Sequence, residues 1–262
     1  MLPFTTYLID LDGVIYRGNE LLPGAKEFIG WLKANNKKFL FLTNNSFASE
    51  TQVLEKLTQL GIITDTSHLL SAGQAAVQNI ARRFPGALVY LVGEPPLIDL
   101  LREYQLQVAD VDAHEADVVL VGLDRHFDYR KLTGAVLSIR AGAHFITVNR
   151  DALLPVAGGF LPGCGTMAAA IEAGTAVAPE VVGKPEPLLL QEAMRMLGSR
   201  PEETVMIGDS LAVDIQGGKA AGTHTLLVLS GNTSLEEVAN SSIKPDYIYQ
   251  DVTALLADLK SS

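Results

Sequence analysis

Residues 7–18, YLIDLDGVIYRG, place two carboxylates at the end of a run that has the character of a buried strand. Residues 7–11 are apolar apart from Asp10, and Asp12 and Gly13 follow directly. Because residues i and i+2 of a strand point to the same face, we expect Asp10 and Asp12 to lie close together. Two carboxylates repel each other in a partly buried place, and a divalent cation relieves that repulsion. The stretch therefore predicts a functional site at the end of a strand.

Similar apolar runs recur along the chain and alternate with helical patterns. The expected strands are residues 7–11, 38–43, 87–92, 117–122, 144–149, 204–208 and 223–229. Helical patterns lie between them, at residues 25–35, 49–61 and 186–198. Near-continuous apolar strands are typical of parallel sheets that are buried on both faces. The alternation predicts an α/β fold with a parallel sheet.

The composition argues against several classes of protein. The formal net charge of −10 at pH 7 argues against a nucleic-acid binder, which needs a basic face. A single cysteine, Cys164, excludes an intramolecular disulfide. Residues 152–171 are uncharged, but two prolines and four glycines predict a loop followed by a helix rather than a membrane span. No signal peptide is recognisable at the N-terminus, so we expect a soluble, cytoplasmic protein.

Polar residues gather after three of the expected strands. These clusters are Asp12-Gly13, residues 43–46 and residues 209–214. Ligands of open α/β sheets bind beyond the carboxyl ends of the strands, so the three clusters are expected at one edge. The strands between residues 87 and 149 are followed by residues that form no comparable polar cluster. This contrast indicates two α/β units, one inserted in the other.

The acidic residues at this edge suit phosphoryl transfer. Asp10 is a candidate nucleophile that would form an aspartyl phosphate, and Asp12 is a candidate general acid and base. With Asp209 they form an oxygen donor set that suits Mg²⁺. The alternative for each aspartate is a turn or a helix N-cap, which is the common role of a lone Asp at a strand end.

Thr43 and Asn44 end the second expected strand and precede a helix. Their hydroxyl and amide groups are suited to donating hydrogen bonds to phosphoryl oxygens. The alternative is a local one, in which Asn45, Ser46 or Ser49 caps the following helix.

Lys184 and Asp214 complete the set of candidates. Lys184 lies in VVGKPEP, before a helix that Pro185 or Pro187 starts, and would neutralise charge on Asp10 and on the phosphoryl group. Asp214 would hold a lysine or a metal-bound water. A solvated surface lysine and a helix-capping aspartate are the alternatives.

Taken together, these segments resemble the haloacid dehalogenase-like hydrolase superfamily. Its four motifs appear in order as DLDGV (10–14), LTNN (42–45), GKPEP (183–187) and GDSLAVD (208–214). Further segments resemble the NagD-like, p-nitrophenylphosphatase-like branch with its type IIA cap: residues 121–132, 142–151 and 161–175. The resemblance implies a Rossmann-like parallel-sheet core, residues 1–76 and 180–262, with an inserted α/β cap domain at residues 77–179.

The resemblance also assigns roles to residues. It implies Asp10 as nucleophile, Asp12 as general acid and base, and a phosphoryl group bound by Thr43, Asn44 and Lys184. It implies Mg²⁺ held by Asp10, the backbone carbonyl of Asp12 and Asp209, with Asp214 in support. The implied activity is hydrolysis of a small phosphorylated metabolite, without nucleic acid or membrane as partner, and with a homodimer among the open oligomeric states.

The cap loop departs from the pattern of the branch. Where relatives often have T-N-P-D, this chain has Val148-Asn149-Arg150-Asp151, which puts a cation in a loop that is expected to contribute to specificity. Asn149, Arg150 and Asp151 are therefore candidate specificity residues. The identity of the substrate stays open.

Other activities fit parts of the pattern. Dehalogenation needs neither a metal nor an acid for an alcohol leaving group, so Asp12 and Asp209 would be superfluous. Phosphoryl transfer to a sugar, rather than to water, would need a cap that excludes water. A non-catalytic phospho-accepting Mg²⁺-binding module, like a response-regulator receiver, uses similar residues but leaves the inserted unit without a role.

Overall fold

The computed structural model describes residues 4–44, 49–156 and 158–261, and the chain folds into two compact units. We call them the core unit, which comprises Met1–Thr43, Glu50–Leu70 and Lys184–Ser262, and the cap unit, which comprises Asn44–Ser49 and Ser71–Gly183. The parallel-sheet α/β fold predicted from the sequence is confirmed.

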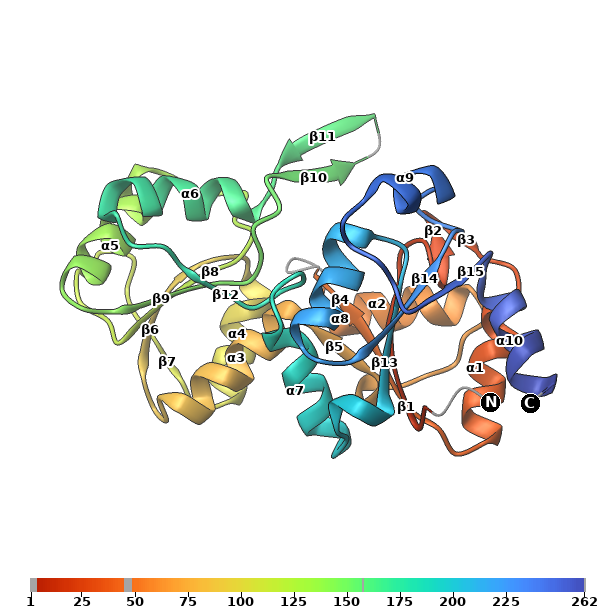
Figure 1. The fold of residues 1–262 in the computed structure, drawn as a ribbon. Helices are drawn as coiled ribbons and strands as arrows, with labels where there is room; N and C mark the ends of the chain where they lie inside the picture. The colour runs from red at the N-terminus through yellow and green to blue at the C-terminus, as the bar shows by residue number, and fades with distance from the viewer. Residues whose placement is uncertain (1–3, 45–48, 157, 262) are drawn as a thin grey trace. The chain divides into compact units, whose positions relative to one another are not determined.

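A six-stranded sheet in the order β15-β14-β13-β1-β4-β5 forms the centre of the core unit (Figure 1). Its strands are β1 (Thr6–Asp10), β4 (Lys38–Thr43), β5 (Leu69–Ser71), β13 (Thr204–Gly208), β14 (His224–Val228) and β15 (Tyr247–Tyr249). β1 pairs in parallel with both β4 and β13, and Asp10 lies opposite Leu42. The carboxyl ends of the three central strands therefore share one edge of the sheet.

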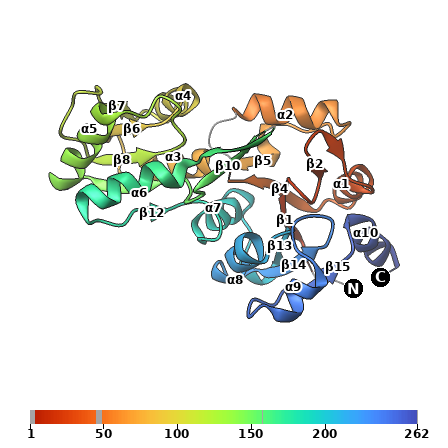
Figure 2. The same ribbon diagram turned by 90° about the horizontal axis from the view of Figure 1, so that it is seen from above.

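Helices cover both faces of this sheet. They are α1 (Ala25–Ala34), α2 (Glu50–Gln59), α7 (Leu188–Leu197), α8 (Gln216–Ala220), α9 (Leu235–Asn240) and α10 (Val252–Ser261). Figure 2 shows α1 and α10 on one side of the sheet and α7 and α8 on the other. α1 is typical of them, because Phe28, Ile29 and Leu32 form a buried stripe at helical spacing.

Short elements connect the strands of the core unit to these helices. They are a two-stranded ribbon of β2 (Tyr16–Arg17) and β3 (Glu20–Leu21), 3₁₀ turns at Thr66–His68 and Pro201–Glu203, and a π-helical turn at Leu211–Ile215. The ribbon follows β1 directly, and the π-helical turn follows β13. Both therefore start at the edge of the sheet where the predicted site residues lie.

The cap unit is built on a second sheet, in the order β12-β9-β8-β6-β7. Its strands are β6 (Leu88–Val92), β7 (Gln107–Val108), β8 (Val118–Val121), β9 (His144–Thr147) and β12 (Glu180–Val181), all paired in parallel. The sheet lies between two pairs of helices (Figure 1). One pair is α3 (Ala72–Arg83) and α4 (Pro95–Glu103), and the other is α5 (Tyr129–Arg140) and α6 (Cys164–Thr175).

The units are divided at slightly different residues from those the sequence predicts. The cap unit begins at Ser71 rather than residue 77, because Ser71 caps α3 and the whole of α3 belongs to the cap unit. It ends at Gly183 rather than residue 179, because β12 pairs with β9 of the cap sheet.

Each of the seven expected strands is present, with ends within two residues of the expected ones. The segment expected as a loop before a helix is different. It forms an antiparallel hairpin of β10 (Leu153–Val156) and β11 (Gly159–Pro162) before α6. Gly158 and Gly159 adopt positive φ angles of 88° and 156° where the two strands connect. These glycines, which led to the prediction of a loop, thus form the turn of a hairpin. None of the described helices has the length and hydropathy to cross a membrane.

Candidate active site

Lys184 joins two carboxylates of the core unit. Its Nζ donates hydrogen bonds to Oδ1 of Asp10 at 2.5 Å and to Oδ1 of Asp214 at 2.7 Å. The side chains of Lys184 and Asp214 are each 2% exposed and that of Asp10 is 15% exposed. β1 supplies Asp10, the π-helical turn supplies Asp214, and Lys184 precedes α7. Three segments distant in sequence therefore form one buried ionic cluster.

The protonation of this cluster reflects burial and close charges. Burial raises the pKa of Asp10 above its usual range, although the charge of Lys184 opposes the change. Burial alone would lower the pKa of Lys184, but the charges and hydrogen bonds of Asp10 and Asp214 raise it. Lys184 is therefore protonated, and a further cation beside the carboxylates would favour their ionised forms.

Asp214 is held by the backbone as well as by Lys184. Its Oδ2 accepts hydrogen bonds from the backbone N–H groups of Asp209, at 3.2 Å, and Ser210, at 3.1 Å. A Cβ atom on Gly208 would collide with the Asp214 side chain, so glycine is required there for this approach. Asp214 thus fixes both the lysine and the turn that carries Asp209.

Asp209 follows β13 and is enclosed by two glycines. A Cβ atom on Gly13 or on Gly231 would collide with Oδ2 of Asp209. The same oxygen accepts a hydrogen bond from the backbone N–H of Asn232 at 2.7 Å. Burial and then the charge of Asp214 raise the pKa of Asp209 to about 6. The loop that follows β14 thus fixes the orientation of this carboxylate.

Asp12 lies in a tight turn after β1, and its side chain is exposed. Gly13 has a φ of +77°, which favours glycine, and its N–H donates to the carbonyl of Tyr16 at 2.8 Å. Ser230 Oγ donates to the carbonyl of Gly13 at 2.7 Å. The turn that carries Asp12 is therefore held from both sides.

Thr43 and Asn44 fall on the two sides of the division between the units. Thr43 ends β4 directly beside β1 and belongs to the core unit. Asn44 belongs to the cap unit, where its carbonyl accepts a hydrogen bond from Asn149 Nδ2 at 2.8 Å. A Cβ on Gly183 would lie 2.8 Å from Asn44 Oδ1. Asn45 and Ser46, the alternative capping residues, lie outside the described residues.

The candidate specificity residues of the cap loop are engaged locally. Oδ1 of the buried Asn149 accepts a hydrogen bond from the N–H of Asp151 at 3.1 Å. Arg150, which is half exposed, donates to Glu172 of α6 at 2.9 Å. The loop is therefore fixed against α6, and the Arg150 guanidinium is held by a carboxylate of its own unit.

The acidic residues of the core unit fit a divalent metal ion. Asp10, Asp209 and Asp214 each offer a carboxylate oxygen, and these oxygens lie within 4.8 Å of one another. Both oxygens of Asp214 are already hydrogen-bonded, to Lys184 and to the backbone. Asp10 and Asp209 are therefore the side chains best suited to hold the metal. A small all-oxygen donor set of this kind suits Mg²⁺.

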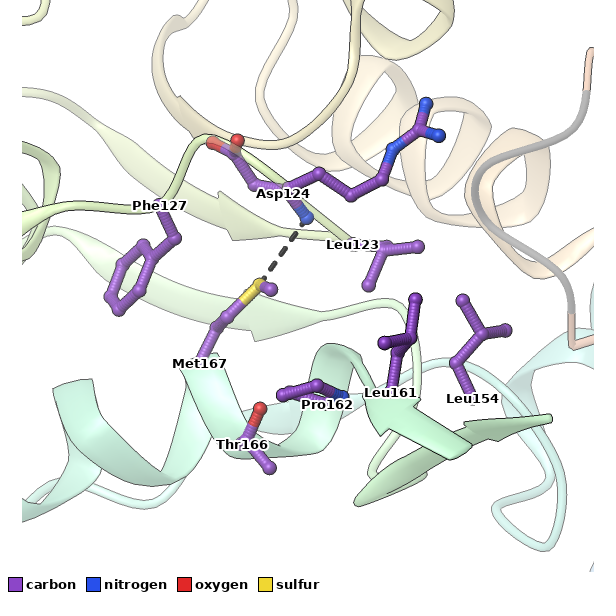
Figure 3. Close-up of a pocket in the computed structure, with 9 residues that line it drawn as sticks. Leu123, Asp124, Phe127, Leu154, Leu161, Pro162, Thr166 and Met167 are labelled. Carbon is purple, nitrogen blue, oxygen red and sulfur yellow. Dashed lines mark hydrogen bonds between the residues drawn. The ribbon is translucent and has the colours of Figure 1, made fainter. Parts of the chain in front are cut away.

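The cap unit contains a pocket of its own, of about 490 Å³ (Figure 3). It is lined mainly by apolar side chains from β10, β11, α6 and the loop after β8: Leu123, Phe127, Leu154, Leu161, Pro162 and Met167. The N–H of Asp124 donates to the sulfur of Met167 at 3.3 Å on its wall. Its volume falls in the range of small-molecule sites.

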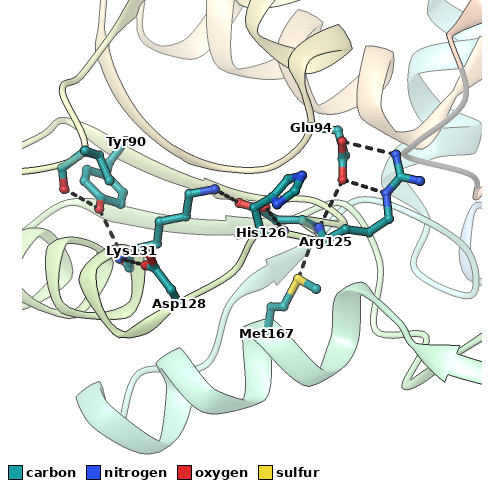
Figure 4. Close-up of polar contacts among 9 residues, drawn as sticks. Tyr90, Glu94, Arg125, His126, Asp128, Lys131 and Met167 are labelled. Atoms are coloured by element: carbon teal, nitrogen blue, oxygen red, sulfur yellow. Dashed lines mark hydrogen bonds and ion pairs between the residues drawn. The ribbon is translucent and has the colours of Figure 1, made fainter.

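Ion pairs brace the loop that forms one wall of this pocket (Figure 4). Arg125 donates to Glu94 through Nε at 3.0 Å and through its backbone N–H at 3.0 Å. Lys131 donates to the buried Asp124 at 2.6 Å. These hydrogen bonds fix the loop between β8 and α5.

Sequence reasoning missed the loop of residues 230–233, which contacts both Gly13 and Asp209. A signal for it was present, because the loop follows the expected strand at residues 223–229 and so leaves the same edge of the sheet. It was missed because it contacts the site through a serine hydroxyl, a backbone N–H and a glycine, which form no recognisable catalytic motif.

Comparison with known proteins identifies the family. Residues 7–107 match the model of haloacid dehalogenase-like hydrolases, and residues 181–255 match a second, HAD-hydrolase-like model. An acid sugar phosphatase of Staphylococcus aureus strain MRSA252 is 37% identical over 260 residues, covering 99% of this chain and 100% of the relative.

Solved structures show the same relationship. The p-nitrophenyl phosphatase from Archaeoglobus fulgidus is 33% identical, with a TM-score of 0.90 and coverage of 97% of this chain and 99% of that chain. NagD from Escherichia coli K-12 is 32% identical, with a TM-score of 0.88 and coverage of 95% and 97%. The chain therefore belongs to the haloacid dehalogenase-like hydrolases, as a phosphatase of their NagD-like branch.

Proposed function

We propose that the protein is a Mg²⁺-dependent phosphatase that hydrolyses small phosphomonoesters through an aspartyl phosphate on Asp10. The observation that carries the proposal is the buried cluster of Asp10, Lys184 and Asp214, with Asp209 beside it. This cluster presents a carboxylate oxygen at the end of β1 next to a fixed cation. That arrangement suits attack by a carboxylate on an anionic phosphoryl group.

In the first step an oxygen of Asp10 attacks phosphorus, and the bond from phosphorus to the ester oxygen breaks. Asp12 donates a proton to that oxygen, so the product leaves as an alcohol. Lys184 offsets negative charge on the phosphoryl group. Thr43 and Asn44 are proposed to donate hydrogen bonds to its oxygens.

In the second step Asp12, now a carboxylate, takes a proton from water. The water oxygen attacks phosphorus, the bond to Asp10 breaks, and inorganic phosphate leaves, with Asp10 restored as a carboxylate and Asp12 restored in its protonated form. Bound Mg²⁺, held by Asp10, Asp209 and the backbone carbonyl of Asp12, would supply positive charge that orients the phosphoryl oxygens. Asp214 keeps Lys184 charged and in position.

Sugar phosphates are the substrate class to test first, because the curated relatives are named acid sugar phosphatases. A panel of sugar phosphates and p-nitrophenyl phosphate is assayed with Mg²⁺ and with EDTA, and we expect multiple turnovers only with the metal. Transfer to an added alcohol faster than to water would indicate a phosphotransferase. A single phosphate released per chain would indicate a phospho-accepting module. A cytoplasmic location is proposed together with this activity on soluble metabolites.

A further inference from the structure

Lys56 of α2 lies over an aromatic ring of the turn that carries Asp12. Its Nζ is 3.6 Å from the centroid of the Tyr16 ring, a cation–π contact within the core unit. The Tyr16 side chain belongs to a residue that is only 5% exposed, so the ring is fixed. Val53 and Leu57 anchor the adjacent face of α2 in the core. The ammonium group is therefore held at a defined place although Lys56 is partly exposed.

Tyr16 connects this cation to the residue proposed as general acid. Asp12 and Tyr16 form an isolated β-bridge, and the Tyr16 carbonyl accepts from Gly13 N–H at 2.8 Å. The Tyr16 N–H in turn donates to the carbonyl of Leu11 at 3.2 Å. The ring beneath Lys56 thus belongs to the same hydrogen-bonded turn as Asp12.

The charge of Lys56 acts on this turn without an ion-pair partner of its own. Within the described part of the chain, its Nζ forms no ion pair with a carboxylate, whereas Lys184 forms two. Partial desolvation by its neighbours raises the pKa of Asp12, and the charges of Lys56 and then of Lys184 oppose that change. The effect of Lys56 on the Asp12 carboxylate is thus the larger of the two.

We propose that Lys56 is a positioning residue of the phosphate site, which rests on the Tyr16 ring and supplies a second positive charge beside Asp12 that strengthens binding of the dianionic phosphoryl group. The inference rests on the proposed phosphatase function. Four aspartates surround the site and Lys184 is already engaged by two of them. A second fixed cation reduces the repulsion that an incoming phosphate dianion meets. The simpler alternative is that Lys56 only joins α2 to the ribbon of β2 and β3.

The test compares Lys56→Met and Lys56→Arg with Lys260→Met, a control that removes the same charge from the exposed end of α10. For each protein, kcat/KM for p-nitrophenyl phosphate and the inhibition constant of inorganic phosphate are measured at low and high ionic strength. We expect Lys56→Met to lower kcat/KM and to weaken phosphate inhibition, each by roughly 10-fold at low salt. The loss should shrink at high salt, because salt screens the lost charge. Lys56→Arg and Lys260→Met should stay within about 3-fold of wild type.

Variants of Tyr16 separate charge from packing. Tyr16→Phe keeps the ring face and should behave like wild type, whereas Tyr16→Leu removes the support of Lys56 and should reproduce the loss of phosphate affinity. The proposal is overturned if Lys56→Met binds phosphate as wild type does. It is also overturned if the loss is independent of salt or is not rescued by Lys56→Arg. If Asp10→Asn retains turnover, the proposed function itself fails, whatever the Lys56 variants do.

Discussion

The ammonium group of Lys184 bridges Asp10 and Asp214, which lie 2.5 Å and 2.7 Å from it and come from opposite ends of the chain. Asp214 is also bonded to the backbone of the turn that carries Asp209. One lysine therefore connects the proposed nucleophile to the proposed metal ligand through a buried carboxylate. Loss of Lys184 leaves two close carboxylates without their cation, whereas loss of either aspartate still leaves the lysine one carboxylate partner.

Replacing Lys184 should damage both stability and activity. Lys184→Met leaves Asp10 and Asp214 facing each other without a cation, and we expect a loss of about 3–5 kcal/mol in the free energy of unfolding. Urea denaturation of the metal-free protein measures this change. Asp214→Asn keeps the ion pair between Lys184 and Asp10, so it should lower the free energy of unfolding by less. An unchanged urea midpoint for Lys184→Met would contradict the role given to this cluster.

Gly231→Ala should weaken metal binding by displacing Asp209, because the new Cβ atom would collide with the carboxylate. Isothermal titration with Mg²⁺ should show at least a tenfold weaker affinity. Gly30→Ala is the control, since it lies in α1 with no atom within 4 Å of the new Cβ. That variant should bind Mg²⁺ normally and gain up to about 1 kcal/mol in stability. Equal Mg²⁺ affinity in both variants would show that Gly231 does not shape the site.

The pKa of Asp209 predicts how pH acts on the metal-free protein. Because it is raised from 3.8 to about 6, the folded protein binds the proton more tightly than the unfolded chain does. The resulting stabilisation is complete below about pH 4 and is lost as the pH rises through about 6. Asp209→Asn should remove this slope from the curve of unfolding free energy against pH. If the contribution of Asp209 to the free energy of unfolding instead grew between pH 4 and 6, its pKa would not be raised in the folded protein.

Mg²⁺ should show the opposite trend with pH. The ion competes with the proton for Asp209 and for Asp10, whose pKa values are both raised, so its affinity should rise steadily between pH 5 and 7. Titration calorimetry at several pH values measures this dependence. Affinity that is flat from pH 5 to 7 would show that Asp209 does not hold the ion.

Asp12→Asn should separate the two chemical steps. p-Nitrophenolate leaves without a proton, so the first step should survive in this variant and release a burst of about one equivalent per chain. The second step lacks its base and should be slow, by roughly 10²–10⁴-fold. Sugar phosphates, whose alkoxides need a proton, should give no burst. Steady turnover of both substrate types at the wild-type rate would exclude Asp12 as acid and base.

Arg150→Ala tests the predicted specificity role of the cap loop. The guanidinium group is half exposed and paired with Glu172, so the loss of stability should be below about 1 kcal/mol. If the loop selects substrates, the ratio of kcat/KM between sugar phosphates and p-nitrophenyl phosphate should change. Glu172→Ala, which breaks the same pair from the other side, should leave that ratio unaltered. Equal ratios for wild type and Arg150→Ala would remove Arg150 from the specificity residues.

Periodicity predicted the sheets well, because strands such as β4 and β13 are buried on both faces and therefore read as continuous apolar runs. The short strands β5 and β12 were not predicted, because a segment of two or three residues is too short to show a periodic pattern of apolar residues. The β10–β11 hairpin was mistaken for a loop because its prolines and glycines resemble loop composition. β12 belongs to the cap unit because it pairs with β9, and no local sequence pattern predicts that pairing.

The site shows a similar division. Asp10, Asp209 and Asp214 could be selected from the sequence, because carboxylates after apolar strands are chemically conspicuous. The contacts between distant residues could not be predicted from the sequence. The two hydrogen bonds of Lys184, for example, join residues separated by 174 and 30 positions. The contributions of Gly231 and Asn232 come from the absence of a side chain and from a backbone N–H, which sequence patterns rarely reveal. The contact of Lys56 with Tyr16 likewise depends on the fold that brings α2 to the ribbon.

Direct capture of the phosphoryl group on Asp10 tests the central claim most closely. Wild-type protein is mixed with Mg²⁺ and a ³²P-labelled sugar phosphate or aryl phosphate, quenched in acid within one turnover, and digested for peptide mapping. The account predicts acid-stable, base-labile label on the peptide that contains Asp10, formed at least as fast as kcat, and none in Asp10→Asn. Full turnover without label on this peptide, together with an active Asp10→Asn protein, would contradict it.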